Sequence, residues 1–149
     1  MEAVIFCGVQ ASGKSTFYAD RFFDSHVRIN LDMLRTRNRE RLLLRACLDA
    51  RQPFVVDNTN PTAAERRAYL DPALAAGFRA VCYFFEVSTR EAIGRNQHRV
   101  RQVPVFGILG TYKRIEPPSL EEGFAQIFKV VPGTADERFV VEETARAGP

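Results

Sequence analysis

The chain has 149 residues, of which 46% are hydrophobic and 26% charged, and its formal net charge is +3 at pH 7. This length and composition are typical of a soluble globular protein with a single domain over residues 1–149 and leave no room for a second catalytic domain. No apolar run approaches the roughly 18 residues that cross a bilayer, and no signal peptide precedes the first predicted strand. We therefore expect a cytoplasmic protein without a membrane partner.

The cysteine and histidine content argues against a structural metal. Cys7, Cys47 and Cys82 form no C-x-x-C pair and fall in predicted strands or on an apolar helix face, where buried free thiols are expected. Only two histidines, His26 and His98, are present. A zinc site built from histidine and cysteine would therefore have too few candidate ligands.

A phosphate-binding loop follows the first predicted strand. The apolar run at residues 3–7 ends at Gly8, and Gly13, Lys14 and Ser15 complete the pattern G-x-x-x-x-G-K-[ST] of a P-loop, or Walker A motif. Its glycines let backbone N–H groups point inward at an anion, Lys14 reaches the outer phosphates, and Ser15 is suited to ligate Mg²⁺. The motif predicts ATP or GTP as phosphate donor. The predicted nucleotide-binding residues of this loop are Gly8, Ala11, Ser12, Gly13, Lys14, Ser15 and Thr16.

The rest of the chain alternates between strands and helices. Further strands are predicted at 27–30, 53–57, 79–87 and 126–131, and helices at 14–23, 32–50, 62–76, 89–101 and 104–115. Capping boxes at Thr62 with Glu65 and at Ser88 with Glu91 mark two helix starts. The segment "RFVVEE" near the C-terminus is a possible edge strand. This order predicts an α/β protein with a P-loop NTPase fold, a parallel sheet of about five strands flanked by helices.

Two carboxylates follow predicted strands, at the sheet edge where ligands bind in such folds. Asp57 ends an apolar strand, as a Walker B aspartate does, and is the predicted Mg²⁺ residue together with Ser15. Asp32 is suited to accept a hydrogen bond from an incoming hydroxyl. An aspartate at that position is also favoured simply as a helix cap.

Basic residues are concentrated in two stretches. Residues 28–52 carry seven Arg and three acids, and residues 88–114 carry six Arg or Lys and one acid. Arg95 and Arg99, four residues apart, would share a helix face and with Arg101 could cover transferring phosphates. Solvated helix faces explain most of these arginines equally well when each is taken singly.

Taken together, the P-loop, "NLDMLR", "VVDNTNP", "RNQHR" followed by "VP", "TYKR" and "PSLEEGF" resemble the kinase domain of polynucleotide 5′-hydroxyl kinases, above all the kinase half of polynucleotide kinase-phosphatases. The likeness covers about residues 3–131. The resemblance implies that Lys14 and Ser15 bind ATP and Mg²⁺ and that Asp32 is the general base. It also implies that Arg35 contacts the acceptor's phosphate and that Arg99 acts on the transferring phosphoryl group together with Arg95. Arg95 is in addition a predicted cofactor-binding residue.

The resemblance also has two departures. Leu31 stands where such kinases often carry Arg, and the chain contains no phosphatase-type D-x-D-x-[TSV] motif. The expected function is thus an ATP-dependent kinase that phosphorylates 5′-hydroxyl ends of DNA or RNA, without 3′-phosphatase activity of its own. Two alternatives remain open: a small-molecule kinase of the gluconate or antibiotic type, and a nucleotide-binding regulatory module.

Overall fold

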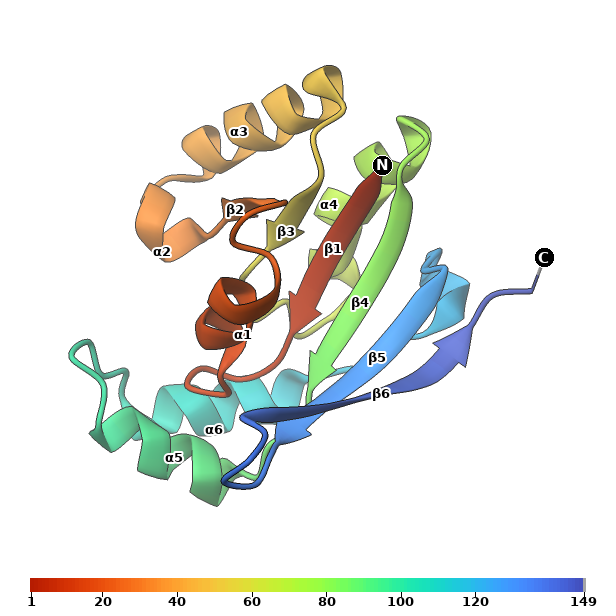
Figure 1. Ribbon diagram of the computed structural model, residues 1–149. Coiled ribbons are helices and arrows are strands. Elements are labelled where there is room, and N and C mark those ends of the chain that lie inside the picture. The colour runs from red at the N-terminus through yellow and green to blue at the C-terminus, as the bar shows by residue number, and fades with distance from the viewer. Residues whose placement is uncertain (149) are drawn as a thin grey trace.

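The computed structural model describes residues 1–148, and its centre is one six-stranded sheet (Figure 1). The strand order is β2-β3-β1-β4-β5-β6, in which every neighbouring pair is parallel except β5 and β6. The predicted α/β fold is confirmed, and the sixth strand is the segment noted as a possible edge strand. The strands are β1 (Glu2–Cys7), β2 (Val27–Ile29), β3 (Phe54–Val56), β4 (Arg79–Phe85), β5 (Gln126–Pro132) and β6 (Phe139–Arg146).

Within residues 1–148, six α-helices and one 3₁₀ turn connect the strands. Both predicted capping boxes begin helices, since the Thr62 side chain accepts a hydrogen bond from the Glu65 N–H and the Ser88 side chain accepts one from the Glu91 N–H. No helix within residues 1–148 has both the length and the apolar character that a membrane crossing requires. The helices are α1 (Lys14–Arg21), α2 (Leu31–Leu34), α3 (Arg37–Ala50), α4 (Ala63–Ala75), α5 (Thr89–Gln97) and α6 (Val105–Arg114), and the turn is η1 (Leu120–Glu122).

The two faces of the sheet pack against different helices because successive side chains of a strand point in opposite directions. Ile5 of β1 belongs to the core shared with α3 and α4, whereas its neighbour Phe6 belongs to the core shared with α1. The second core is rich in aromatic rings, with Phe17 of α1 in edge-to-face contact with Phe6 and Phe85. The three cysteines are buried and free, as expected.

The structure corrects three predicted helix ends. The helix predicted at 32–50 is broken: Arg35 adopts a left-handed φ of 77°, and the Thr36 side chain then caps α3 by accepting from the Arg39 N–H. The helix predicted at 89–101 ends at Gln97. Its end is set by a closed loop, because the Asn96 side chain donates to the Val103 carbonyl and accepts from its N–H. The helix predicted at 14–23 ends at Arg21.

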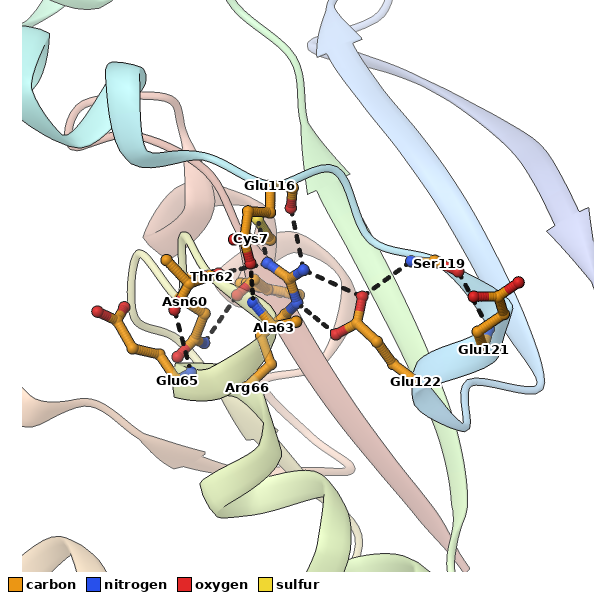
Figure 2. A network of polar contacts seen from close by, with 11 residues as sticks. Cys7, Asn60, Thr62, Ala63, Glu65, Arg66, Glu116, Ser119, Glu121 and Glu122 are labelled. Carbon is orange, nitrogen blue, oxygen red and sulfur yellow. Dashed lines mark hydrogen bonds and ion pairs between the residues drawn. The ribbon is translucent and has the colours of Figure 1, made fainter.

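The buried side chain of Arg66 links the end of β1 to the segment before β5 (Figure 2). The Arg66 side chain of α4 has no solvent exposure and forms an ion pair with Glu122, at 2.8 Å between Nε and Oε1 and 3.0 Å between Nη2 and Oε2. It also donates to the carbonyls of Asn60 and Glu116 and to the Cys7 sulfur. The network therefore fixes the backbone around Asn60, which in turn lies against the end of β1.

We expect Arg66→Met to lower the free energy of unfolding by about 3–5 kcal/mol, because it leaves the largely buried Glu122 carboxylate and two carbonyls without their partner. Urea denaturation followed by circular dichroism measures this. The matched control is Arg67→Met, which changes the neighbouring exposed arginine and should stay within about 0.5 kcal/mol. Equal effects of the two substitutions would contradict the assignment.

Candidate active site

One large cavity, of about 1040 Å³, opens where the parallel strands end. It is lined by the P-loop, by α2 and the residues after β3, by α3 and α4, and by the segment that begins with α5. In Figure 1, α5 and α6 lie below this edge of the sheet, α2 lies to its left, and α3 lies above α2. Ligand sites of open α/β sheets lie at this edge, so the cavity is the candidate active site.

Lys14 is held inside the P-loop by the loop's own carbonyls. Its ammonium donates to the Gly8 carbonyl at 2.9 Å, to the Val9 carbonyl at 2.6 Å and to the Ser12 hydroxyl at 3.3 Å. Burial lowers the pKa of Lys14 to about 8, because removing an ammonium from water disfavours its charged form. A bound anion in the cavity would raise this pKa again, because it favours the charged form of Lys14.

The glycines of the loop are required by close approach. At Gly8, the Cβ of any other residue would lie 2.8 Å from Phe85 Cβ, so the strand end is tightly packed. At Gly13, which has a φ of 97°, a Cβ would lie 2.6 Å from Arg95 Nη1 and 3.0 Å from a ring carbon of Phe139. Arg95 of α5 and Phe139 of β6 therefore cover the loop directly at Gly13.

The predicted metal residues lie together, and one arginine is hydrogen-bonded to both of them. Ser15 Oγ donates to Asp57 Oδ2 at 2.9 Å, and both are oxygen ligands of the kind that Mg²⁺ prefers. The Arg28 side chain donates to the same Asp57 oxygen at 2.8 Å and to Ser15 Oγ at 2.9 Å. The pair thus fits a magnesium ion, and Arg28 supplies a positive charge at the same oxygens.

Asp32 lies on the single-turn helix α2, which two asparagines attach to the end of β3. The Asn30 side chain donates to the Asp57 carbonyl at 2.6 Å and caps α2 by accepting from the Met33 N–H at 2.9 Å. The Asn58 side chain accepts from the Leu31 N–H at 2.9 Å. Asp32 itself is exposed and lines the cavity. Asn30, and not Asp32, is the residue that caps this helix.

A polar network forms the floor of the cavity between α3 and α4. The buried Glu40 carboxylate accepts from Arg37 at 2.9 Å, from the Tyr69 hydroxyl at 3.0 Å and from the Asn58 amide at 2.9 Å. Burial, with the nearby Glu40 charge, raises the pKa of Tyr69 to about 12. Asn58 therefore links the floor of the cavity to the backbone that precedes Asp32.

The cavity brings together most of the predicted site residues. Arg95 and Arg99 both line it, although Arg99 lies beyond the end of α5 and not on a common helix face with Arg95. Arg35 is exposed beside α2 and is not part of the lining, and Gly8 and Ser12 lie behind the loop surface. The other predicted residues of the lining are Ala11, Gly13, Lys14, Ser15, Thr16, Asp32 and Asp57.

Several lining or supporting residues were not predicted. Arg28 sits in the short strand β2, Phe139 is the first residue of the edge strand β6, and Arg138 directly precedes it. No sequence pattern indicates that Arg28 reaches the P-loop, because β2 pairs with β3 and not with the P-loop strand β1. The asparagines of "DNTNP" were noted as a motif, but nothing in the spacing indicated which backbone groups they bind.

Comparisons with known proteins agree with this fold and loop. A family model described as an AAA domain (AAA_33) matches residues 4–114. The bifunctional polynucleotide phosphatase/kinase of Schizosaccharomyces pombe is 28% identical over 138 aligned residues. The match covers 87% of this chain and 33% of that protein. The chain thus spans about a third of the length of this curated relative.

Solved structures show the same fold at lower identity. The gluconokinase from Sinorhizobium meliloti 1021 superimposes with a TM-score of 0.61 at 20% identity, covering 87% of this chain and 82% of that one. Chaetomium thermophilum Kti12, solved in complex with ADP-AlF3, gives a TM-score of 0.61 at 16% identity, covering 87% and 88%. With its P-loop kinase fold and the match over residues 4–114, the chain belongs to the AAA_33 family of AAA domains.

Proposed function

We propose that residues 1–149 act as one kinase domain that transfers the γ-phosphoryl group of ATP to the 5′-hydroxyl end of DNA or RNA. The observation that carries this proposal is the shared cavity of Lys14, Asp32 and Arg99. A phosphate cradle, an exposed carboxylate and an arginine beyond the end of a helix then surround one space. A regulatory nucleotide-binding module would need the first of these groups but neither of the others.

Each residue has a distinct role in the proposed transfer. The P-loop N–H groups and Lys14 bind the β- and γ-phosphates. Asp32 accepts the proton of the 5′-hydroxyl while the hydroxyl oxygen forms its bond to the γ-phosphorus. The bond between the γ-phosphorus and the oxygen bridging it to the β-phosphorus breaks, and ADP leaves. Arg99, with Arg95, stabilises the charge on the transferring group. Mg²⁺, held by Ser15 and Asp57, would neutralise phosphate charge. GTP is the alternative phosphate donor.

A polynucleotide acceptor is supported by a curated relative that matches 87% of this chain. The Schizosaccharomyces pombe protein is named a polynucleotide phosphatase/kinase. Asp32 and Arg35 lie in "NLDMLR", one of the motifs on which the resemblance to polynucleotide 5′-hydroxyl kinases rests. A small-molecule acceptor is the alternative, because a gluconokinase has the same fold. Arg35 is proposed to contact the acceptor's phosphate from its exposed position after α2.

An acceptor panel tests the proposed function. The protein is incubated with γ-labelled ATP, Mg²⁺ and either 5′-hydroxyl oligonucleotides of DNA and RNA, 5′-phosphorylated oligonucleotides, nucleosides, or gluconate. We expect label only on the 5′-hydroxyl oligonucleotides. Efficient labelling of gluconate with none on oligonucleotides would favour the small-molecule kinase.

We expect nucleotide binding to take up protons near pH 8, because the phosphates favour the charged form of Lys14, whose pKa is lowered to about 8 before binding. Affinity for ATP should therefore fall as pH rises above about 8. Titration calorimetry in buffers of different ionisation enthalpy measures the uptake.

Lys14→Ala should abolish that uptake and reduce transfer by at least about a hundredfold, the scale of removing one preorganised charge partner. The exposed lysine of α6 gives the control, since Lys113→Ala should leave both quantities unchanged. Normal turnover of Lys14→Ala would rule out the P-loop as the donor site.

Asp32→Asn should reduce transfer to a 5′-hydroxyl oligonucleotide by about two to four powers of ten, the range of a positioned general base. ATP affinity should survive, because no P-loop contact involves Asp32. The free energy of unfolding should change by less than about 1 kcal/mol, because Asn30 caps α2 and Asp32 is exposed.

Three measurements on this variant separate a base from a structural residue: turnover, ATP affinity and melting temperature. Asp71→Asn, which removes an exposed carboxylate of α4 outside the cavity, controls for the loss of charge. A fully active Asp32→Asn enzyme would refute the assignment.

A further inference from the structure

The cavity continues past Asp32 into a cleft between α3 and α4. Arg37, Arg41 and Leu44 of α3 line one side of this part, and Ala68 and Tyr69 of α4 line the other. The whole cavity, at about 1040 Å³, reaches the top of the range of about 300–1,000 Å³ for a single ligand. It therefore has room for an acceptor group beside a nucleoside triphosphate.

Arginines stand at successive turns of α3 where the cleft opens. Arg37, Arg41 and Arg45 are four residues apart, which places them on one helix face at intervals of about 6 Å along the axis. Arg37 and Arg41 line the cavity, and Arg45 lies one turn farther from Asp32. In Figure 1 α3 runs from α2 toward the upper end of the molecule, away from the P-loop. The row thus leads out of the proposed active site.

The three arginines differ in how far their charge is already neutralised. Arg37 is bound to the buried Glu40, and Arg45 forms an exposed pair with Asp49 at 3.3 Å, a geometry that contributes little. Within residues 1–148, Arg41 has no carboxylate partner and donates only to the neutral side chain of Asn38, at 2.5 Å. Arg41 therefore presents a full positive charge at the mouth of the cleft.

We propose that Arg41, flanked by Arg37 and Arg45, binds the phosphodiester backbone of the acceptor strand as it leaves the active site. This inference rests on the proposed function and defines its acceptor further: a strand of several nucleotides is preferred to a mononucleotide. Evenly spaced phosphates match a row of arginines, whose planar guanidinium groups bind phosphate oxygens in pairs. A sugar acid or a nucleoside carries no chain of phosphates that could extend past the first turn of α3.

The test compares acceptors of different length in binding and in transfer. The probes are a thymidine hexanucleotide with a 5′-hydroxyl and a 3′-fluorescein, and thymidine 3′-monophosphate, which has one phosphate. Arg41→Gln should weaken hexanucleotide binding by about tenfold by fluorescence anisotropy, the loss of one charge-assisted contact. The slope of log affinity against log salt should fall by about 0.7, the contribution of one single-strand phosphate.

The matched control is Arg67→Gln, which removes the same charge from an exposed position of α4 outside the cavity. It should leave hexanucleotide affinity and the salt slope unchanged. In transfer, the loss in kcat/KM of Arg41→Gln should be about tenfold larger for the hexanucleotide than for thymidine 3′-monophosphate. Arg45→Gln should show a smaller loss, confined to the hexanucleotide.

Two failures are distinguishable. Equal hexanucleotide affinity and salt slope for Arg41→Gln and the parent protein, or equal losses of transfer for both acceptors, would overturn the backbone contact and leave the kinase function standing. Absence of transfer to every 5′-hydroxyl acceptor, with hexanucleotide binding that still depends on Arg41, would overturn the kinase function and support the contact.

Discussion

The site depends on how the buried carboxylate of Asp57 is satisfied. A charge removed from water must be paired and hydrogen-bonded, and Asp57 obtains this from Ser15 of the P-loop and from Arg28 of β2. Its backbone carbonyl is held by Asn30, which also caps α2. One residue thus joins the phosphate loop, the second strand and the helix that carries Asp32. In the proposed site, a metal ion at Ser15 and Asp57 would compete with Arg28 for the two oxygens to which Arg28 donates.

The fold could be predicted because its local signals agree with one another. The strand before Gly8, the spacing to Gly13 and Lys14, and the two capping boxes each indicated an element that the structure contains. The break at Arg35 could not be predicted, since its left-handed φ of 77° is unusual for a residue with a side chain. The chain on either side of Arg35 is held by the Asn30 and Thr36 caps and by the hydrogen bond that the Leu31 N–H donates to the Asn58 side chain.

The candidate site also contains residues that could be predicted from the sequence and residues that could not. Lys14, Ser15 and Asp57 were predictable because their chemistry depends on a short motif or on the end of an apolar strand. Arg28 and Phe139 were not, because they reach the P-loop only through pairing of β2 and β6 at opposite edges of the sheet. Arg99 was expected on a helix face, but the loop closed by Asn96 and Val103 carries it instead. The presence of Arg99 in the site was predictable, but the loop that positions it was not.

The break between α2 and α3 has a consequence for how two substrates can share one cavity. An unbroken helix from residue 32 onward would place Asp32 and Arg41 on a single rigid rod, nine residues apart and on faces related only by helical periodicity. With the break, α2 is oriented by Asn30 and Asn58 against the strand ends, whereas α3 is oriented by Glu40 and Tyr69 against α4. Asn58 belongs to both sets of contacts, so the two orientations are fixed relative to each other. In the proposed reaction, Asp32 can then face the acceptor's 5′-hydroxyl while α3 presents its arginines to the outgoing strand.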